Sequence, residues 1–224
     1  MYPRFLKAVA LIAICFCVPL LHAQTTVQVD SVANLACERM ESIETSGDEE
    51  LLRAVYSQQF VPYLEQVDEA QQEKTSMQLF YRMQRNCESF RALLQRLDPP
   101  ADSVSFKYQK PVANIKNRDL KAFKKQENFY YLESDGKTTQ VSMKDGIWID
   151  SFPDGSYSKL NYSWISKNEF VLEFISSDNR SRAMLSVPGD LYYYQVLAKM
   201  DTYYLMSVNI QGQNVYEEFR MYFD

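Results

Sequence analysis

The sequence predicts an α+β protein in which an N-terminal three-helix bundle is followed by an antiparallel β-meander that closes into a barrel or a sandwich. Residues 24–99 carry apolar side chains at helical spacing, with 13 acidic, seven basic and six aromatic residues. Residues 100–224 hold 22 aromatic residues, and turn signals recur there at steps of about eight to twelve residues. The boundary lies at Asp98-Pro99-Pro100 because consecutive prolines cannot continue a helix.

A secretory signal is predicted for residues 1–23. Arg4 and Lys7 precede an apolar run, residues 8–21, that is too short to span a bilayer, and Ala23 is a suitable residue before a cleavage site. We therefore expect a secreted or periplasmic protein that has no transmembrane segment once the signal is removed.

Removal of the signal also removes His22, the only histidine of the chain. This excludes histidine-dependent triads, histidine metal sites and imidazole acid–base catalysis from the mature protein. The mature chain would carry 22 basic and 29 acidic residues, a balance that disfavours binding to nucleic acid. No cofactor and no metal site is predicted.

Three helices are expected in residues 24–99. Asp30 is a suitable cap for the first helix, and the second begins at the acidic residues that start with Asp48. Pro62 should bend or split this second helix because proline lacks the backbone N–H that a helix interior needs. A third helix, capped near Thr75, carries an apolar stripe at steps of three or four residues: Leu79, Met83, Cys87, Phe90, Leu94 and Leu97.

The mature chain keeps two cysteines, Cys37 on the first helix and Cys87 on the inward stripe of the third. A compact bundle could bring them together, and in an exported protein we expect a disulfide bond between them. Closing a loop of about 50 residues would stabilise the fold by roughly 4 kcal/mol in the chain-entropy model. A redox-active or metal-binding pair is the alternative, but the chain has no C-x-x-C spacing.

The residues ACERMESI, which begin at Ala36, and RNCESF, which begin at Arg85, resemble a helical segment of uncharacterised exported proteins of Bacteroidota. Those segments often carry a second cysteine two positions after the first, where this chain has Arg39. The resemblance implies origin and export, and it implies no mechanism.

Nine strand-like runs follow Pro100, separated by turn signals such as Asp135-Gly136 and Asp145-Gly146. Links of hairpin length favour a meander that closes into a barrel or a sandwich. Residues 112–125 are the exception, and we expect a short helix or a loop there. The runs are FYYLE, TTQVSM, IWIDSF, SKLNYSWI, EFVLEFI, RAMLSV, LYYYQVLAK, YYLMSVNI and VYEEFRMYF.

Aromatic residues alternate along several of these runs. EFVLEFI places its two phenylalanines on one face, which we expect to be buried, and Tyr162 and Trp164 share a face in the preceding run. In LYYYQVLAK, Tyr192 and Tyr194 lie opposite Tyr193. Because both faces of this strand are apolar, a second covering surface is expected, either the helical bundle or a ligand.

The runs WISKNEFVLEFISSDN and SVPGDLYYYQVL resemble small exported β-rich proteins of Bacteroidota, and their meander is similar to lipocalin-like barrels. Such a barrel is wide enough either to be filled by its own side chains or to hold one small ligand. The burial preference of aromatic side chains favours a plain core. If a ligand binds, the candidate residues are Trp148, Tyr162, Trp164, Tyr192, Tyr193 and Tyr194.

Acidic pairs suggest a second kind of site. Glu169 with Glu173, and Glu217 with Glu218, could act as paired carboxylates in sugar hydrolysis. The first pair projects from the outer face of one strand, and the second alternates across its strand. We therefore interpret both pairs as solvated surface.

Residues 107–125 hold seven basic residues against one acidic residue. Three interpretations are open: contact with the acidic helical domain, contact with anionic surface glycans or lipids, and a solvated connector. The connector is favoured because charge runs often only solvate a chain.

Together these observations predict a non-catalytic exported binding protein, which binds a small amphipathic ligand in the β domain or another envelope protein. The alternative is a carboxylate-dependent hydrolase that acts on an extracellular substrate. An enclosed, partly apolar cavity would favour binding, whereas two carboxylates facing each other across a cleft would favour hydrolysis.

Overall fold

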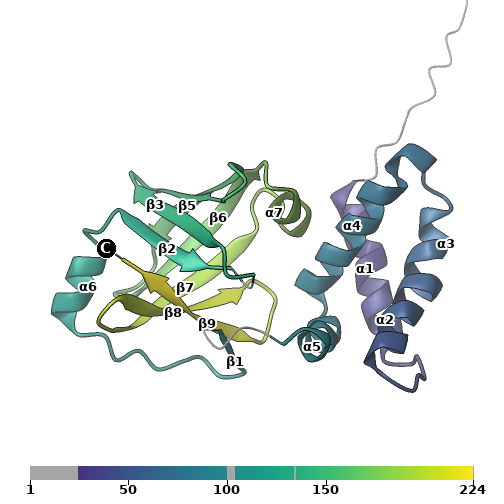
Figure 1. The fold of residues 1–224 in the computed structure, drawn as a ribbon, viewed down its shortest axis with the longest axis horizontal. Helices are drawn as coiled ribbons and strands as arrows, with labels where there is room; N and C mark the ends of the chain where they lie inside the picture. The colour runs from purple at the N-terminus through teal and green to yellow at the C-terminus, as the bar shows by residue number, and fades with distance from the viewer. Residues whose placement is uncertain (1–24, 100–103, 134, 224) are drawn as a thin grey trace, which may run out of the picture.

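A computed structural model describes residues 25–99, 104–133 and 135–223. The predicted signal, residues 1–23, lies outside the described residues, as does Pro100 of the predicted boundary. Figure 1 shows a helical part beside a β-barrel, so the predicted α+β class is confirmed. No described helix is both long enough and apolar enough to cross a bilayer.

The helical part comprises α1 (Thr26–Met40), α2 (Asp48–Val55), the π-helical turn η1 (Tyr56–Phe60), α3 (Val61–Leu64), α4 (Glu69–Asn86) and α5 (Glu88–Leu97). These segments share one buried core, which includes Leu79, Met83 and Phe90 from the predicted stripe. Helical periodicity therefore identified the buried face correctly.

Two helix caps differ from the expected ones. Thr25 caps α1 in a capping box, so the expectation that Asp30 does so is wrong. Asp68 caps α4 because its side chain accepts a hydrogen bond from the backbone N–H of Ala70, and Thr75 is buried inside that helix. Asp30 instead makes a tertiary ion pair with Arg82.

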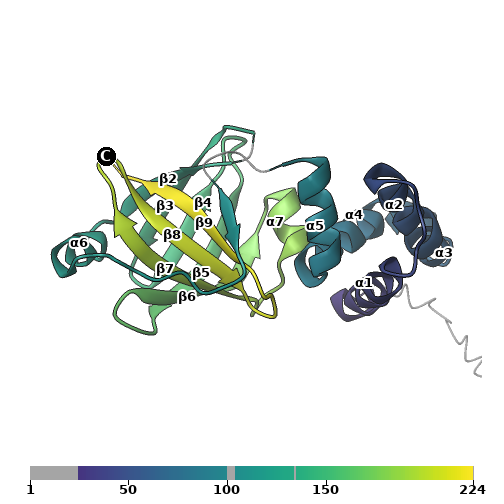
Figure 2. The same cartoon turned by 90° about the horizontal axis from the view of Figure 1, so that it is seen from below.

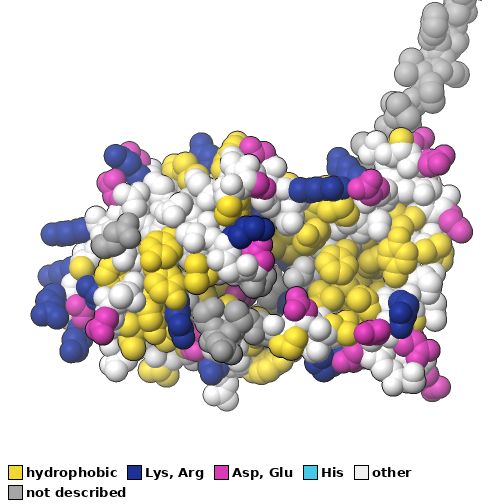
Figure 3. Space-filling model, in the orientation of Figure 1, with side chains coloured by type: hydrophobic (Ala, Val, Ile, Leu, Met, Phe, Trp, Pro, Cys, Tyr) yellow, Lys and Arg dark blue, Asp and Glu magenta, His cyan; other side chains and the backbone are white. Residues whose placement is uncertain are grey.

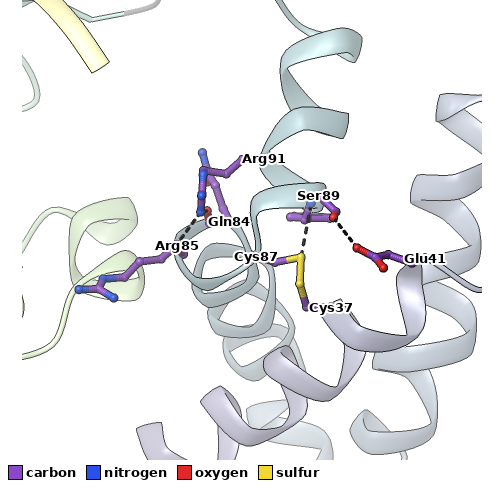
Figure 4. Close-up of a disulfide and its surroundings, with 8 residues drawn as sticks. Cys37, Glu41, Gln84, Arg85, Cys87, Ser89 and Arg91 are labelled. Carbon is purple, nitrogen blue, oxygen red and sulfur yellow. Dashed lines mark hydrogen bonds between the residues drawn. A yellow bond between two sulfur atoms is a disulfide. The ribbon is translucent and has the colours of Figure 1, made fainter. Parts of the chain in front are cut away.

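Two irregularities interrupt the predicted helices. Pro62 follows the π-helical turn η1, because its ring clashes with the preceding turn and it has no N–H to donate. Extended backbone at Cys87 (φ −115°, ψ 113°) divides the predicted third helix into α4 and α5. At this break Cys87 forms the predicted disulfide with Cys37, with 5.6 Å between the Cα atoms (Figure 4).

The barrel strands are β2 (Asn128–Leu132), β3 (Thr138–Lys144), β4 (Ile147–Ser151), β5 (Tyr157–Trp164), β6 (Glu169–Ser177), β7 (Leu191–Lys199), β8 (Tyr203–Ile210) and β9 (Tyr216–Tyr222). Each strand pairs antiparallel with the next, and β9 pairs with both β8 and β2, which closes the sheet. A short strand, β1 (Ser105–Lys107), also pairs with β9. The chain therefore forms a closed barrel and not a sandwich.

The prediction of a strand for the run RAMLSV is wrong. Arg180–Leu185 forms the helix α7, which begins after Asn179, whose side chain accepts a hydrogen bond from the backbone N–H of Arg182. The other eight predicted runs are strands, and β1 is one that the turn pattern does not indicate. The segment 112–125 contains the expected short helix, α6 (Asn117–Phe123).

The hairpin connections define two ends of the barrel. The turns after β3, β5 and β7 lie with α6 at one end, the α6 end; the turns after β2, β4 and β8 lie with α7 at the other, the α7 end. Figures 1 and 2 show that the helical part packs beside the α7 end. At the β3–β4 turn, Asp145 and Gly146 have φ angles of 51° and 78°, as the predicted two-residue hairpin requires.

Polar contacts between α4 and α7 connect the helical part to the barrel. The Tyr81 hydroxyl lies 2.9 Å from Ser181 Oγ. Arg82 donates to the backbone carbonyl of Leu185, the last residue of α7, at 2.7 Å. α7 is thus held on the side that faces the helical part.

A candidate ligand-binding site in the barrel lumen

Aromatic side chains fill the α6 end of the lumen. Phe123 of α6 inserts among Phe129, Phe170 and Tyr204, with ring centroids 5.0, 6.2 and 4.9 Å away. These four side chains are almost fully buried. Trp164 packs edge-on against Phe123 at 6.1 Å. This end of the barrel is therefore a solid core.

The α7 end of the lumen is polar instead. Four strands each turn one polar residue inward, because residues two positions from a buried aromatic residue share its face. These residues are Tyr131 of β2, Asp150 of β4, Tyr194 of β7 and Glu217 of β9. Glu133 follows β2, and Arg182 approaches from α7. We call the six residues the lumen polar cluster: Tyr131, Glu133, Asp150, Arg182, Tyr194 and Glu217.

Arg182 and Glu133 form an ion pair within this cluster. Arg182 Nη2 lies 2.8 Å from Glu133 Oε1 and 2.9 Å from Oε2, and Thr139 Oγ1 donates to Oε1 at 2.8 Å. Burial opposes the charge of Arg182, but the surrounding oxygens of Tyr131, Glu133 and Asp150 raise its pKa above the ordinary value. Arg182 therefore stays charged, and Glu133 neutralises it directly.

Asp150 and Glu217 are the poorly solvated carboxyl groups of the cluster. Burial raises the pKa of Asp150 to about 6, although the indole Nε1 of Trp148 donates to Asp150 Oδ1 at 2.8 Å. Burial also raises the pKa of Glu217, and the charge of Arg182 offsets only part of that shift. At neutral pH the cluster therefore holds more negative than positive charge.

Tyr131 and Tyr194 complete the lumen polar cluster. Tyr194 also joins the cluster to two aromatic side chains, Trp148 and Phe170, which we call the aromatic wall. Burial raises the pKa of Tyr131 and of Tyr194, so both hydroxyl groups keep their protons and can donate hydrogen bonds. The Tyr194 ring stacks on Phe170 at 5.3 Å and lies 5.5 Å from the ring of Trp148. Polar and aromatic surfaces thus meet at one level of the barrel.

Water reaches the lumen polar cluster in part. The side chains of Arg182 and Glu133 keep 35% and 27% of their surface exposed, although the barrel wall and α7 surround them. Two surface hollows lie outside the lumen. One of about 540 Å³ lies at residues 46–53 of the helical part, and one of about 680 Å³ lies between residues 107–112 and the outer face of β7 and β8.

The structure turns five of the six candidate aromatic residues toward the lumen: Trp148, Tyr162, Trp164, Tyr192 and Tyr194. Tyr193 lies on the outer face of β7 and is 37% exposed. Only Trp148 and Tyr194 reach the lumen polar cluster directly, since Trp148 bonds Asp150 and Tyr194 is a member. The outer face of β7 is covered near Leu197 by residues 108–114. This cover is neither the helical bundle nor a ligand, which were the two expected ones.

The interpretation of Glu217 as solvated surface is wrong, because β9 turns it into the lumen beside Arg182. Glu218 lies on the opposite face, where it accepts a hydrogen bond from Ser105 at 3.1 Å. Asp150 could have been found from its position two residues after Trp148, since such residues share a face. Arg182 could not be found in this way, because it lies in the helix α7, where strand alternation does not apply.

Among the residues that the structure describes, no three acidic, histidine or cysteine side chains converge as metal ligands. Comparison of the chain with family models, curated proteins and solved structures finds no match.

The arrangement can accept a positively charged or hydrogen-bond-donating group. Arg182 pairs directly with Glu133 and acts on Asp150 and Glu217 only through its field. A cation placed beside these two carboxyl groups would lower the pKa of both and favour their charged forms. The aromatic wall next to them suits an apolar or flat body.

Proposed function

We propose that the chain is an exported, non-catalytic binding protein whose barrel takes a small amphipathic ligand at the α7 end of the lumen. The observation that carries this proposal is the placement of Asp150 and Glu217, whose pKa values are raised by burial, against the aromatic wall. Desolvated ionisable groups cost stability and gather at functional sites. A cationic head group would offset that cost, because it replaces the water that the carboxyl groups have lost.

In this proposal the ligand lies with its head group at Asp150 and Glu217 and its apolar body along Trp148 and Tyr194. A barrel of eight strands holds at most one small ligand. The barrel would act as lipocalin-like barrels do. Residues 24–99 would be a three-helix bundle domain, with α2 to α3 and α4 to α5 each serving as one broken helix, and this domain would stand beside the α7 end.

Export is part of the proposal. The charged and apolar pattern of residues 1–23 supports a cleaved signal, and the bond between Cys37 and Cys87 fits an oxidising compartment. A secreted or periplasmic location and an origin in Bacteroidota follow from this signal and from the sequence resemblance. Another envelope protein is a second class of partner, and the apolar side chains over the helical part in Figure 3 support it.

Ligand binding can be tested by tryptophan fluorescence in a Trp164→Phe background, which leaves Trp148 as the reporter beside Asp150. Decylamine, decanol and decanoate share one chain and differ only in head group. At pH 7.5 we expect decylamine to shift Trp148 emission and to bind at least about tenfold tighter than the other two, because only its head group compensates the carboxylates. Decylamine should also raise the melting temperature by mass action.

Asp150→Asn with Glu217→Gln should remove the preference for decylamine. The matched control is Glu169→Gln with Glu173→Gln, which removes two carboxylates from the outer face of β6 and should bind as the wild type does. If no compound binds, or if both double variants behave alike, the lumen site is not a binding site of this kind.

A carboxylate-dependent hydrolase is the second candidate, and the pKa of Asp150, about 6, favours it because a carboxyl group with that pKa can donate a proton near neutral pH. The wild type would be incubated with nitrophenyl esters and glycosides. Turnover that Asp150→Asn removes and Glu173→Gln keeps would favour hydrolysis over binding alone.

A further inference from the structure

The α6 end of the barrel carries a concentrated positive charge. The whole chain has 24 basic and 29 acidic residues, so the excess at this end is opposite in sign to the net charge of −5. Figure 3 shows the basic side chains gathered over α6. We call the following residues the α6-end surface, eight basic and four acidic: Lys116, Arg118, Lys121, Lys124, Lys125, Lys144, Lys167, Lys199, Asp119, Glu127, Asp145 and Asp201.

Most of the lysines on this surface are not neutralised. Within the described part of the chain, no carboxylate lies within ion-pair distance of Lys116, Lys121, Lys125 or Lys167, all of which are exposed. Lys124 Nζ lies 3.8 Å above the ring centroid of Trp164. An aromatic face thus holds this ammonium group at the surface and leaves its charge available.

Two large apolar side chains stand within this basic surface. Ile165, in the turn after β5, is 52% exposed, and Met200, in the turn after β7, is 48% exposed. Both turns lie at the α6 end. Exposed apolar side chains among lysines suit the bilayer interface, where ammonium groups meet anionic head groups and apolar groups reach the acyl chains.

The α6-end surface is anchored on the barrel core and faces away from the helical part. Leu120 and Phe123 anchor the inner face of α6 in the barrel core and are 3% and 1% exposed. The helical part packs at the opposite end of the barrel (Figures 1 and 2). Residues 116–125, the second part of the basic run 107–125, therefore do not contact the acidic helical part of the same chain. The first part of the run does lie near it, since Tyr108 interacts electrostatically with Arg91 of α5.

We propose that the α6-end surface docks the protein on an anionic lipid bilayer, with Ile165 and Met200 entering the head-group layer. Charge complementarity selects this occupant and its orientation. A positive end on a chain of net charge −5 is attracted to an anionic plane while the rest of the molecule is repelled. The surface lies at the opposite end from the lumen polar cluster, so its test is independent of the proposed ligand.

Vesicle sedimentation tests the proposal with the mature protein. We expect binding to vesicles of equal phosphatidylglycerol and phosphatidylcholine at about 0.1 M salt, and no binding to phosphatidylcholine alone. Raising the salt to about 0.5 M should weaken binding at least about tenfold, since it shortens the Debye length. Lys121→Glu with Lys125→Glu should weaken it by a similar factor. Ile165→Ser with Met200→Ser should weaken it while keeping its salt dependence.

Two matched controls change the same chemistry elsewhere. Lys74→Glu with Lys107→Glu reverses two exposed lysines outside the α6 end. Leu132→Ser with Tyr157→Ser removes two apolar side chains that are 40% and 41% exposed at the α7 end. Both controls should bind as the wild type does, and circular dichroism should show that every variant is folded.

Four results would overturn the proposal: no vesicle binding, equal binding to both vesicle types, equal losses in the matched controls, and binding to soluble heparin without binding to vesicles. Concentration-dependent self-association that Lys121→Glu with Lys125→Glu abolishes, without vesicle binding, would instead assign the surface to a second copy of the chain.

Discussion

Arg82 Nη1 lies 3.3 Å from Asp190 Oδ2, and this ion pair joins α4 to the connection that enters β7. The same guanidinium donates from Nη2 to Asp30 of α1 at 2.8 Å. The side chains of Arg82 and Asp190 are only 5% and 13% exposed. Arg85 adds a second contact to Asp190, at 3.0 Å. One nearly buried cation therefore links two helices to the barrel.

Arg82→Ala should lower the free energy of unfolding by about 3–5 kcal/mol, because it removes a nearly buried cation from the carboxylates of Asp30 and Asp190, whose side chains are only 26% and 13% exposed. Urea denaturation followed by far-ultraviolet dichroism and by tryptophan emission measures this loss. Arg96→Ala is the control, since it breaks an exposed pair with Asp48 and should cost less than about 1 kcal/mol. Equal costs for the two variants would contradict the linking role of Arg82.

The bond between Cys37 and Cys87 should leave the mature protein without a free thiol when it is unfolded and not reduced. The two residues are 50 positions apart, so Cys37→Ser with Cys87→Ser should lower the free energy of unfolding by about 4 kcal/mol in the chain-entropy model. Thiol titration and denaturation of the variant check both statements. Two reactive thiols in the unreduced wild type would show that the bond does not form.

Asp150 should make stability fall as pH rises. Its pKa is raised from 3.8 to about 6 in the folded protein, so the folded state holds a proton that the unfolded chain releases. The contribution of this proton to stability is fully present below about pH 4 and is lost as pH rises through about 6. The shift corresponds to at most about 3 kcal/mol.

Asp150→Asn should therefore be more stable relative to the wild type at pH 7.5 than at pH 4. Asparagine can still accept the hydrogen bond from Trp148, so the comparison isolates the charge. Asp201→Asn, at an exposed turn, is the control. Parallel pH profiles for the wild type and Asp150→Asn would argue against a desolvated carboxyl group in the lumen.

We predict that mass spectrometry of exported protein finds Gln24 at the N-terminus, because the charged start, the short apolar run and Ala23 match the pattern of a cleavable signal. A mature chain that still carries His22 would contradict the cleavage. It would also reopen the histidine chemistry that removal of the signal excludes.

The sequence by itself determined the local elements of this protein. Alternation in EFVLEFI predicts which side chains β6 buries, and Asp145-Gly146 predicts a hairpin turn, because both depend on residues a few positions apart. The helical spacing of residues 79–97 likewise predicts the buried stripe that brings Cys87 to Cys37. The buried aromatic residues of β6 and the pairing of the two cysteines could therefore be predicted from local pattern alone.

Only the tertiary structure decided which faces of those elements are buried and which are exposed. Alternation places Glu217 and Glu218 on opposite faces, but the closing pairs of β9 with β8 and β2 decide that Glu217 is the one inside. The run at α7 is a helix whose last carbonyl accepts a hydrogen bond from Arg82, 103 positions earlier in the chain. α6 turns its lysines outward because its apolar face closes the barrel end opposite the helical part. Burial at these positions depends on contacts between residues that are far apart in the sequence, and local periodicity cannot predict such contacts.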